Sequence, residues 1–173
     1  MQQIDTIRVS TRETSVLEQL FKTVDGGTLT RLRNIGELWG INLSSIEPGL
    51  LGRVMSRMEE VDLDMYYCKI TNIQAVALFT AIAEDNTVKI LNMAGTDLSH
   101  VQPVLMARAV HKVQEVGMYN TQLTKQQVTA ILRQCVEGET AMKELFLREN
   151  NTAMAGVEQG LIREAREKIV LKY

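Results

Sequence analysis

Leu98-Ser99-His100-Val101-Gln102-Pro103 has a counterpart in Leu43-Ser44-Ser45-Ile46-Glu47-Pro48, which lies 55 residues earlier in the chain. The correspondence continues after both stretches, where Arg53 matches Arg108 and Glu60 matches Glu115. A match over this length is an internal repeat, and internal repeats indicate similar units that stack side by side. The two copies therefore predict a fold built from stacked units.

The composition fits one soluble globular domain, since 45% of the 173 residues are hydrophobic and 23% are charged. The net charge of −2 argues against nucleic acid as a partner, because that binding requires clustered Lys and Arg. Two cysteines are too few for a disulfide framework and suit a cytoplasmic protein. The sequence has no secretory signal and no apolar run of about 18 residues, so we expect no membrane segment.

A short pattern of apolar residues at its first, fourth and sixth positions recurs along the chain. The clear copies are Met58/Val61/Leu63, Val88/Leu91/Met93, Val113/Val116/Met118 and Met142/Leu145/Leu147. Each copy reads as a strand, and each is followed by a stretch with apolar residues at helical spacing. We therefore expect Val61, Leu91, Val116 and Leu145 to lie next to one another in the interior.

The two ends of the chain follow the pattern less closely. A first strand is predicted at 4–9 and a helix at 15–24, and a second strand copy contains Leu29 and Leu32. The segment 35–42 reads as an insertion, and a further helix is predicted at about 45–57. Near the other end, Ile169-Val170-Leu171 is predicted to be a final edge strand.

A polar or small residue and then an apolar residue follow three of the copies, as Cys68-Lys69-Ile70, Thr96-Asp97-Leu98 and Thr121-Gln122-Leu123. This pattern resembles the leucine-rich repeat, L-x-x-L-x-L followed by N/C-x-L. Units of 25–30 residues with a full helix resemble its ribonuclease-inhibitor-like subtype, as in the repeat domains of NOD-like receptors and tropomodulins.

The resemblance implies an α/β fold, a leucine-rich-repeat solenoid of about five to six repeats. It implies a curved parallel sheet on the concave face and helices on the convex face. The whole chain, 1–173, would be a single domain with its clearest repeats in 58–150, irregular repeats in 1–57 and a capping helix in 153–173. Cys68 and Asn150 lie at the family's asparagine-ladder position, and Thr96 and Thr121 depart from its consensus there.

The concave face is the predicted partner-binding site, because alternate strand residues point outward onto it. The candidate contact residues are Glu60, Asp62, Asp64, Asn92, Glu115, Tyr119, Glu144, Phe146 and Arg148. Their acidic excess would attract a basic partner, and the two aromatic side chains would anchor it. The alternative is that these residues only keep the sheet face solvated. Tyr66-Tyr67, in a turn that reads as two residues longer than its counterparts, would either form a contact loop or pack on the neighbouring repeat.

No catalytic or cofactor-binding constellation is recognisable in the sequence. It contains neither phosphate-binding glycine motif and no nucleophile elbow, and its two histidines are spaced too widely to share a metal ion. We therefore expect a non-catalytic protein–protein interaction module without cofactor or metal. The alternative is a structural segment of a larger assembly, either an actin-binding end like that of tropomodulin or the sensing arm of a receptor.

Overall fold

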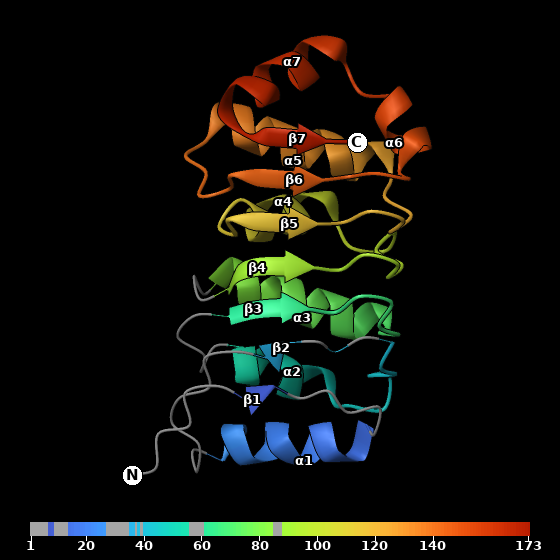
Figure 1. The fold of residues 1–173 in the computed structure, drawn as a ribbon, viewed down its shortest axis with the longest axis vertical. Coiled ribbons are helices and arrows are strands. Elements are labelled where there is room, and N and C mark those ends of the chain that lie inside the picture. Colours follow the sequence, from blue (N-terminus) through green and yellow to red (C-terminus); the bar gives the residue numbers. More distant parts are fainter. Residues whose placement is uncertain are drawn as a thin grey trace.

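The computed structural model describes residues 7–8, 14–26, 35–36, 38, 40–55, 61–84 and 88–173. In this part of the chain, strands and helices alternate along the sequence in an α/β fold with a parallel sheet (Figure 1). The elements are β1 (Ile7–Arg8), α1 (Thr14–Asp25), β2 (Ile35–Gly36), α2 (Pro48–Met55), β3 (Val61–Asp64), α3 (Asn72–Glu84), β4 (Val88–Asn92), α4 (Pro103–Val110), β5 (Glu115–Gly117), α5 (Lys125–Glu137), β6 (Glu144–Phe146), α6 (Asn151–Ala155), α7 (Gln159–Lys168) and β7 (Val170–Lys172).

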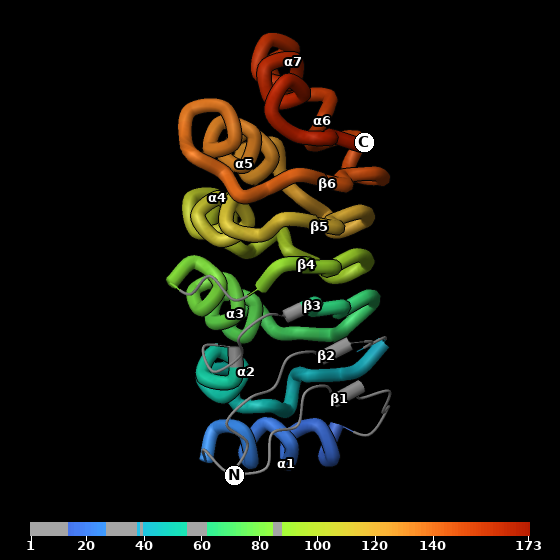
Figure 2. The backbone as a smooth tube through the Cα atoms, turned by 60° about the vertical axis from the view of Figure 1, so that its left-hand side comes forward, coloured from blue at the N-terminus to red at the C-terminus, as the bar shows by residue number. Residues whose placement is uncertain are grey.

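The sheet follows the order of the chain. Among the described residues it has seven strands, in the order β1 to β7, and each strand is parallel to the next. The register aligns Ile7, Ile35, Leu63, Leu91, Val116, Leu145 and Leu171 across the sheet. The helices α2 to α5 lie on one side of it, and none of them covers the other side (Figure 2). We call this uncovered side the open face.

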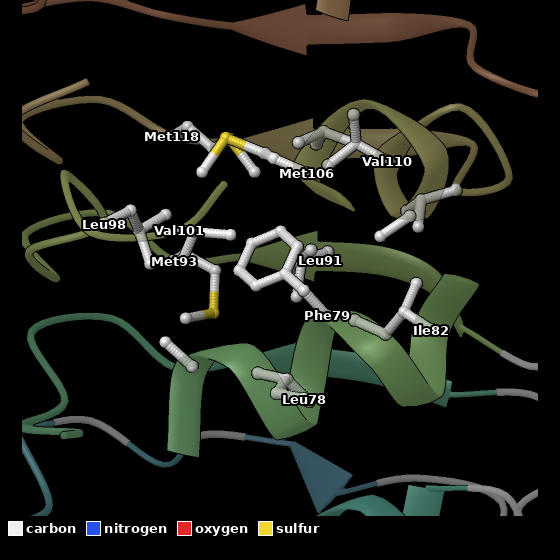
Figure 3. Packing of buried hydrophobic residues seen from close by; sticks show 14 of the residues in the cluster. Leu78, Phe79, Ile82, Leu91, Met93, Leu98, Val101, Met106, Val110 and Met118 are labelled. Atoms are coloured by element: carbon white, nitrogen blue, oxygen red, sulfur yellow. The ribbon is translucent and has the colours of Figure 1, made fainter. Parts of the chain in front are cut away.

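The core lies between the sheet and the helices and runs as one apolar cluster from α1 to β7. Figure 3 shows its central part, where the Phe79 ring of α3 lies beside Leu91 of β4 and below Met106 of α4. A single strand and helix could not bury their apolar surfaces alone, so each unit depends on its neighbours. Burial of each such large side chain contributes about 1.5–3 kcal/mol.

The register corrects one prediction. Leu63, and not Val61, is aligned with Leu91, whereas Val61 pairs with Val88. The expected alignment of Val61 is therefore wrong by two residues, while that of Leu91, Val116 and Leu145 is confirmed. A slip of two residues is hard to detect in a sequence because strand side chains alternate with a period of two, so the same faces stay buried and exposed.

The region read as an insertion contains the second strand. Ile35 pairs with Ile7 on one side and Leu63 on the other, and Leu38, Ile41 and Leu43 are buried behind it. The insertion predicted over 35–42 is therefore wrong. The predicted strand residues 29 and 32 lie outside the described part of the chain. Since the aligned residues fall at positions 7, 35, 63 and 91, the first units have a constant spacing of 28 residues.

The C-terminal region contains more secondary-structure elements than predicted. The capping helix expected over 153–173 is two helices, α6 and α7, followed by the strand β7. The edge strand predicted at Ile169-Val170-Leu171 is confirmed as β7, which starts one residue later and pairs with β6. The helix α7 packs on α5 (Figure 1) and buries Ile162 and Ala165, while its charged side chains are exposed.

The turns after the strands share one geometry. Gly40, Tyr67, Gly95, Asn120 and Glu149 occupy the same position in successive turns, and all five have a positive φ. The next residue is buried in every turn, and in the later ones it is Cys68, Thr96, Thr121 and Asn150. These four side chains hydrogen-bond to backbone carbonyl groups, as when Asn150 Nδ2 donates to Met118 at 2.5 Å. They satisfy buried carbonyl groups where the chain leaves the sheet.

Candidate functional site

Two rows of outward side chains cross the open face, because alternate residues of each strand point away from the helices. We call the first the acidic row; it consists of Asp62, Ile90, Glu115, Glu144 and Val170. The second, the middle row, consists of Asp64, Asn92, Gly117, Phe146 and Lys172. Tyr66, Ala94, Tyr119 and Arg148 continue the pattern just beyond the strands.

Gly117 lies in the middle row and leaves a hollow there, since it has no side chain. The resulting groove, which we call the Gly117 groove, has a volume of about 590 Å³. Its outward-facing lining consists of Ile90, Asn92, Glu115, Gly117, Tyr119, Phe146, Arg148, Glu149 and Lys172. A Cβ atom on Gly117 would stand 3.0 Å from Asn92 Oδ1, so glycine also lets β4 and β5 approach without disturbing that amide.

The amide of Asn92 is fixed by its surroundings. Its Nδ2 donates to Asp64 Oδ1 at 3.0 Å, and its Oδ1 accepts the backbone N–H of Ala94 at 3.1 Å. Asp64 in turn accepts the backbone N–H of Tyr66 at 3.2 Å. These contacts tie the ends of β3 and β4 together, so Asp64 and Asn92 form a rigid wall beside the groove.

The charges on the open face are partly paired. Lys172 Nζ lies 3.3 Å from Glu144 Oε2 and 4.5 Å from the centre of the Phe146 ring. Glu115 and Arg148, in contrast, form no ion pair within the described part of the chain, and both side chains are exposed. The charges of Glu115 and Arg148 are therefore available to a ligand.

Three tyrosine rings form a cluster beside the groove. The rings of Tyr66 and Tyr67 meet edge to face with their centres 4.5 Å apart, and Tyr66 lies 5.8 Å from Tyr119. A hydrogen bond with the Tyr66 side chain raises the pKa of Tyr119 to about 12, so its hydroxyl stays protonated at neutral pH. Tyr67 packs over Gly95, where a Cβ atom would stand only 2.6 Å from its ring.

The expanded turn predicted at Tyr66-Tyr67 is wrong. From Met65 to Ile70 the turn has the same length as those from Met93 to Leu98 and from Met118 to Leu123. The apparent expansion came from the two-residue slip in register.

The structure brings five of the predicted contact residues together around the Gly117 groove, namely Asn92, Glu115, Tyr119, Phe146 and Arg148. Asp62, Asp64 and Glu144 lie on the same face outside the groove lining, and Glu60 lies outside the described residues. Sequence reasoning missed Lys172 and Glu149. The alternation within the predicted final strand would have placed Lys172 beside Phe146, because it lies two residues after Val170.

The described residues hold no group of three or more His, Cys, Asp and Glu side chains that could bind a metal ion. Both cysteines are buried, and burial raises the pKa of Cys68 to about 12 and that of Cys135 to about 11. Both thiols stay protonated at neutral pH, and a thiol is a much weaker nucleophile than a thiolate.

No helix in the described ranges combines the length and apolar character needed to cross a bilayer. In comparisons with known proteins, no family model and no curated protein matches this chain.

Proposed function

We propose that this chain is a leucine-rich-repeat solenoid that binds a protein partner, without catalysis, through the open face of its sheet. Three observations support the repeat assignment: the strands follow chain order, one buried residue from each of β3 to β7 is aligned across the sheet, and the turns share one geometry. Such stacked units have a continuous exposed sheet surface that is suited to binding extended partners.

The Gly117 groove is the observation that carries the binding proposal. Half-buried Phe146 and Ile90 flank a hollow, with Tyr119 beside it, and unpaired charges stand at its margins. Interface hot spots combine aromatic anchors with pockets from which water is displaced. A sheet face that served only for solvation would need neither the hollow nor the aromatic walls. The acidic row favours a partner with a basic surface, because opposite charges guide association.

The variant Gly117→Leu tests this proposal. Gly117 lies within β5 and does not have a positive φ, so the backbone there accepts a leucine, whose side chain would displace the Asn92 amide slightly and fill the groove. We expect affinity capture with the wild-type protein to retain a partner that Gly117→Leu loses, while both proteins give the same circular dichroism spectrum. The matched control is Gln126→Leu, which adds the same side chain to an exposed position on α5.

Equal capture by the wild-type protein and Gly117→Leu would contradict the proposal. The alternative role, as a structural or sensing segment of a larger assembly, does not require the Gly117 groove. Partners that bind the wild-type protein and Gly117→Leu equally would therefore favour that role.

A further inference from the structure

The Gly117 groove has opposite charges at its two ends. Glu115 belongs to the acidic row, where the strands begin, and Arg148 follows the end of β6. The residue of β6 aligned with Glu115 is Glu144, so four residues along the strand separate the two ends. At about 3.3 Å per residue, the anionic and cationic ends are roughly 13 Å apart.

Two of the other charged groups near the groove already have partners within the protein. Lys172 is shared between Glu144 and the Phe146 ring, and Asp64 accepts hydrogen bonds from Asn92 and Tyr66. Glu149 lines the same end as Arg148 without forming an ion pair with it among the described contacts. Because Arg148 continues the outward pattern of β6 while Glu149 lies in the following turn, Glu115 and Arg148 set the polarity along the strands.

The apolar contacts of the groove lie in its middle, where Gly117 separates the Phe146 ring from the Asn92 amide. The hollow over Gly117 lies between the two charged ends, with Phe146 next to it in the middle row and Tyr119 two residues further along β5. A side chain entering this hollow would lie about two residues along the strand direction from either charge. The groove thus offers three contacts at regular intervals: an anion, an apolar hollow and a cation.

An extended peptide matches this spacing, because its side chains at i, i+2 and i+4 point to one side and span the same roughly 13 Å. We propose that the groove binds an extended segment whose alternate side chains are basic, large and apolar, and acidic. The basic side chain pairs with Glu115, the apolar one fills the hollow over Gly117, and the acidic one pairs with Arg148. This inference rests on the proposed function and names the chemistry of its partner.

Selection from a random peptide library tests the inference. The wild-type protein is expected to enrich a basic residue, a large apolar residue and an acidic residue at intervals of two, read in either chain direction. Glu115→Arg should replace the basic preference with an acidic one, and Arg148→Glu should replace the acidic preference with a basic one. Arg133→Glu, a charge reversal on the exposed side of α5, should leave the preferences unchanged.

Synthetic peptides then measure the effect in solution. For the peptide with the wild-type pattern, fluorescence polarisation should show about tenfold weaker binding to either groove variant, or about 1.4 kcal/mol, since the one exposed charge contact that each variant reverses changes from attraction to repulsion. A peptide with two basic side chains should recover affinity for Arg148→Glu, and one with two acidic side chains should recover affinity for Glu115→Arg, whichever direction the peptide runs.

The outcomes distinguish a failure of the charge pattern from a failure of the Gly117 groove as the binding site. If the wild-type protein enriches peptides that Gly117→Leu does not enrich, and the charge reversals do not change which peptides are enriched, the charge pattern is overturned and binding at the groove is retained. Enrichment that is identical for the wild-type protein and Gly117→Leu would overturn both the inference and the proposed site. If the wild-type protein enriches no peptide, the extended-segment inference fails, while the capture experiment still decides the proposed function.

Discussion

At the scale of single residues, the turns after the strands require a strained backbone conformation, and residues of different types adopt it. Five equivalent turn positions have a positive φ, but only Gly40 and Gly95 are glycines. At the others, Tyr67, Asn120 and Glu149 hold the left-handed conformation with a side chain. That conformation costs a residue with a Cβ atom roughly 1–2 kcal/mol. Tyr67 has ring contacts with Tyr66 and Gly95 that offset this cost, whereas the Glu149 side chain is exposed.

Glu149→Gly is therefore expected to stabilise the protein. Relief of the left-handed strain should raise the free energy of unfolding by about 1 kcal/mol relative to Glu149→Ala, which removes the same carboxylate and keeps the Cβ atom. Urea denaturation of the two variants measures the difference. Equal stability of Glu149→Gly and Glu149→Ala would mean that the turn does not strain the backbone at this position.

At the scale of elements, two buried glutamines explain why the internal repeat appears over two units. Gln127 of α5 donates from Nε2 to the carbonyl groups of Leu98 and Val101, at 2.8 and 2.6 Å, and it forms a capping box with Thr124. Gln74 of α3 makes the same contacts with Leu43 and Ile46. The duplicated stretches thus supply the acceptors, and the glutamine of the following unit supplies the donor. Units with acceptors alternate with units that carry the glutamine.

Gln127→Ala is expected to lower the free energy of unfolding by about 2–3 kcal/mol. The variant leaves the buried Val101 carbonyl without its side-chain donor, at a cost of about 1–3 kcal/mol, and removes the capping box of α5. The control is Gln126→Ala, because Gln126 is the exposed neighbour on the same helix. Chemical denaturation of both variants measures the two effects, and a loss as small for Gln127→Ala as for Gln126→Ala would contradict the role of the glutamine.

The elements that could be predicted from the sequence are those with a long periodic pattern. The helices α1, α3 and α5 were predicted because each has apolar residues at helical spacing over a dozen or so positions. The strand β2 was missed because Ile35-Gly36 contains one apolar residue and a glycine, whereas Leu29 and Leu32 match the apolar spacing of the repeated pattern better. The register of β3 was misplaced because both Val61 and Leu63 are apolar, and pairing with β4 selects between them.

The sequence predicts which residues lie on the open face, but it does not predict the groove that some of them form. Alternation along strands places Asn92, Glu115 and Phe146 on one side for any register that keeps the apolar residues buried. The groove, in contrast, depends on which residues of neighbouring strands lie opposite one another. The position of Gly117 between Asn92 and Phe146, and the pairing of Lys172 with Glu144, are set by that register. Pairing between strands is a long-range property that a local pattern does not specify.

At the scale of the whole molecule, the free energy of unfolding depends mainly on contacts between adjoining units. Helix α3 packs on α2 and α4, and α5 packs on α4 and α7, so each unit chiefly contacts the adjoining ones. In such an arrangement, stability approximates the sum of the unit stabilities and the interfaces between neighbours. Changes at two interfaces that share no residue should then be independent. Gln74 and Gln127 offer this test, because one joins α3 to the segment before α2 and the other joins α5 to the segment before α4.

The double variant of Gln74→Ala and Gln127→Ala is expected to lower the free energy of unfolding by the sum of the two single-variant decreases, within about 0.5 kcal/mol. The reason is physical separation: the glutamines have no hydrogen-bond partner in common, and α4 lies between α3 and α5. A double-mutant cycle from urea denaturation measures the coupling. Gln127→Ala combined with Thr124→Ala is the positive control, because both residues belong to one capping box and their losses should overlap. A coupling between Gln74 and Gln127 as large as that of the control pair would show that distant units act together, and the nearest-neighbour description of this stack would fail.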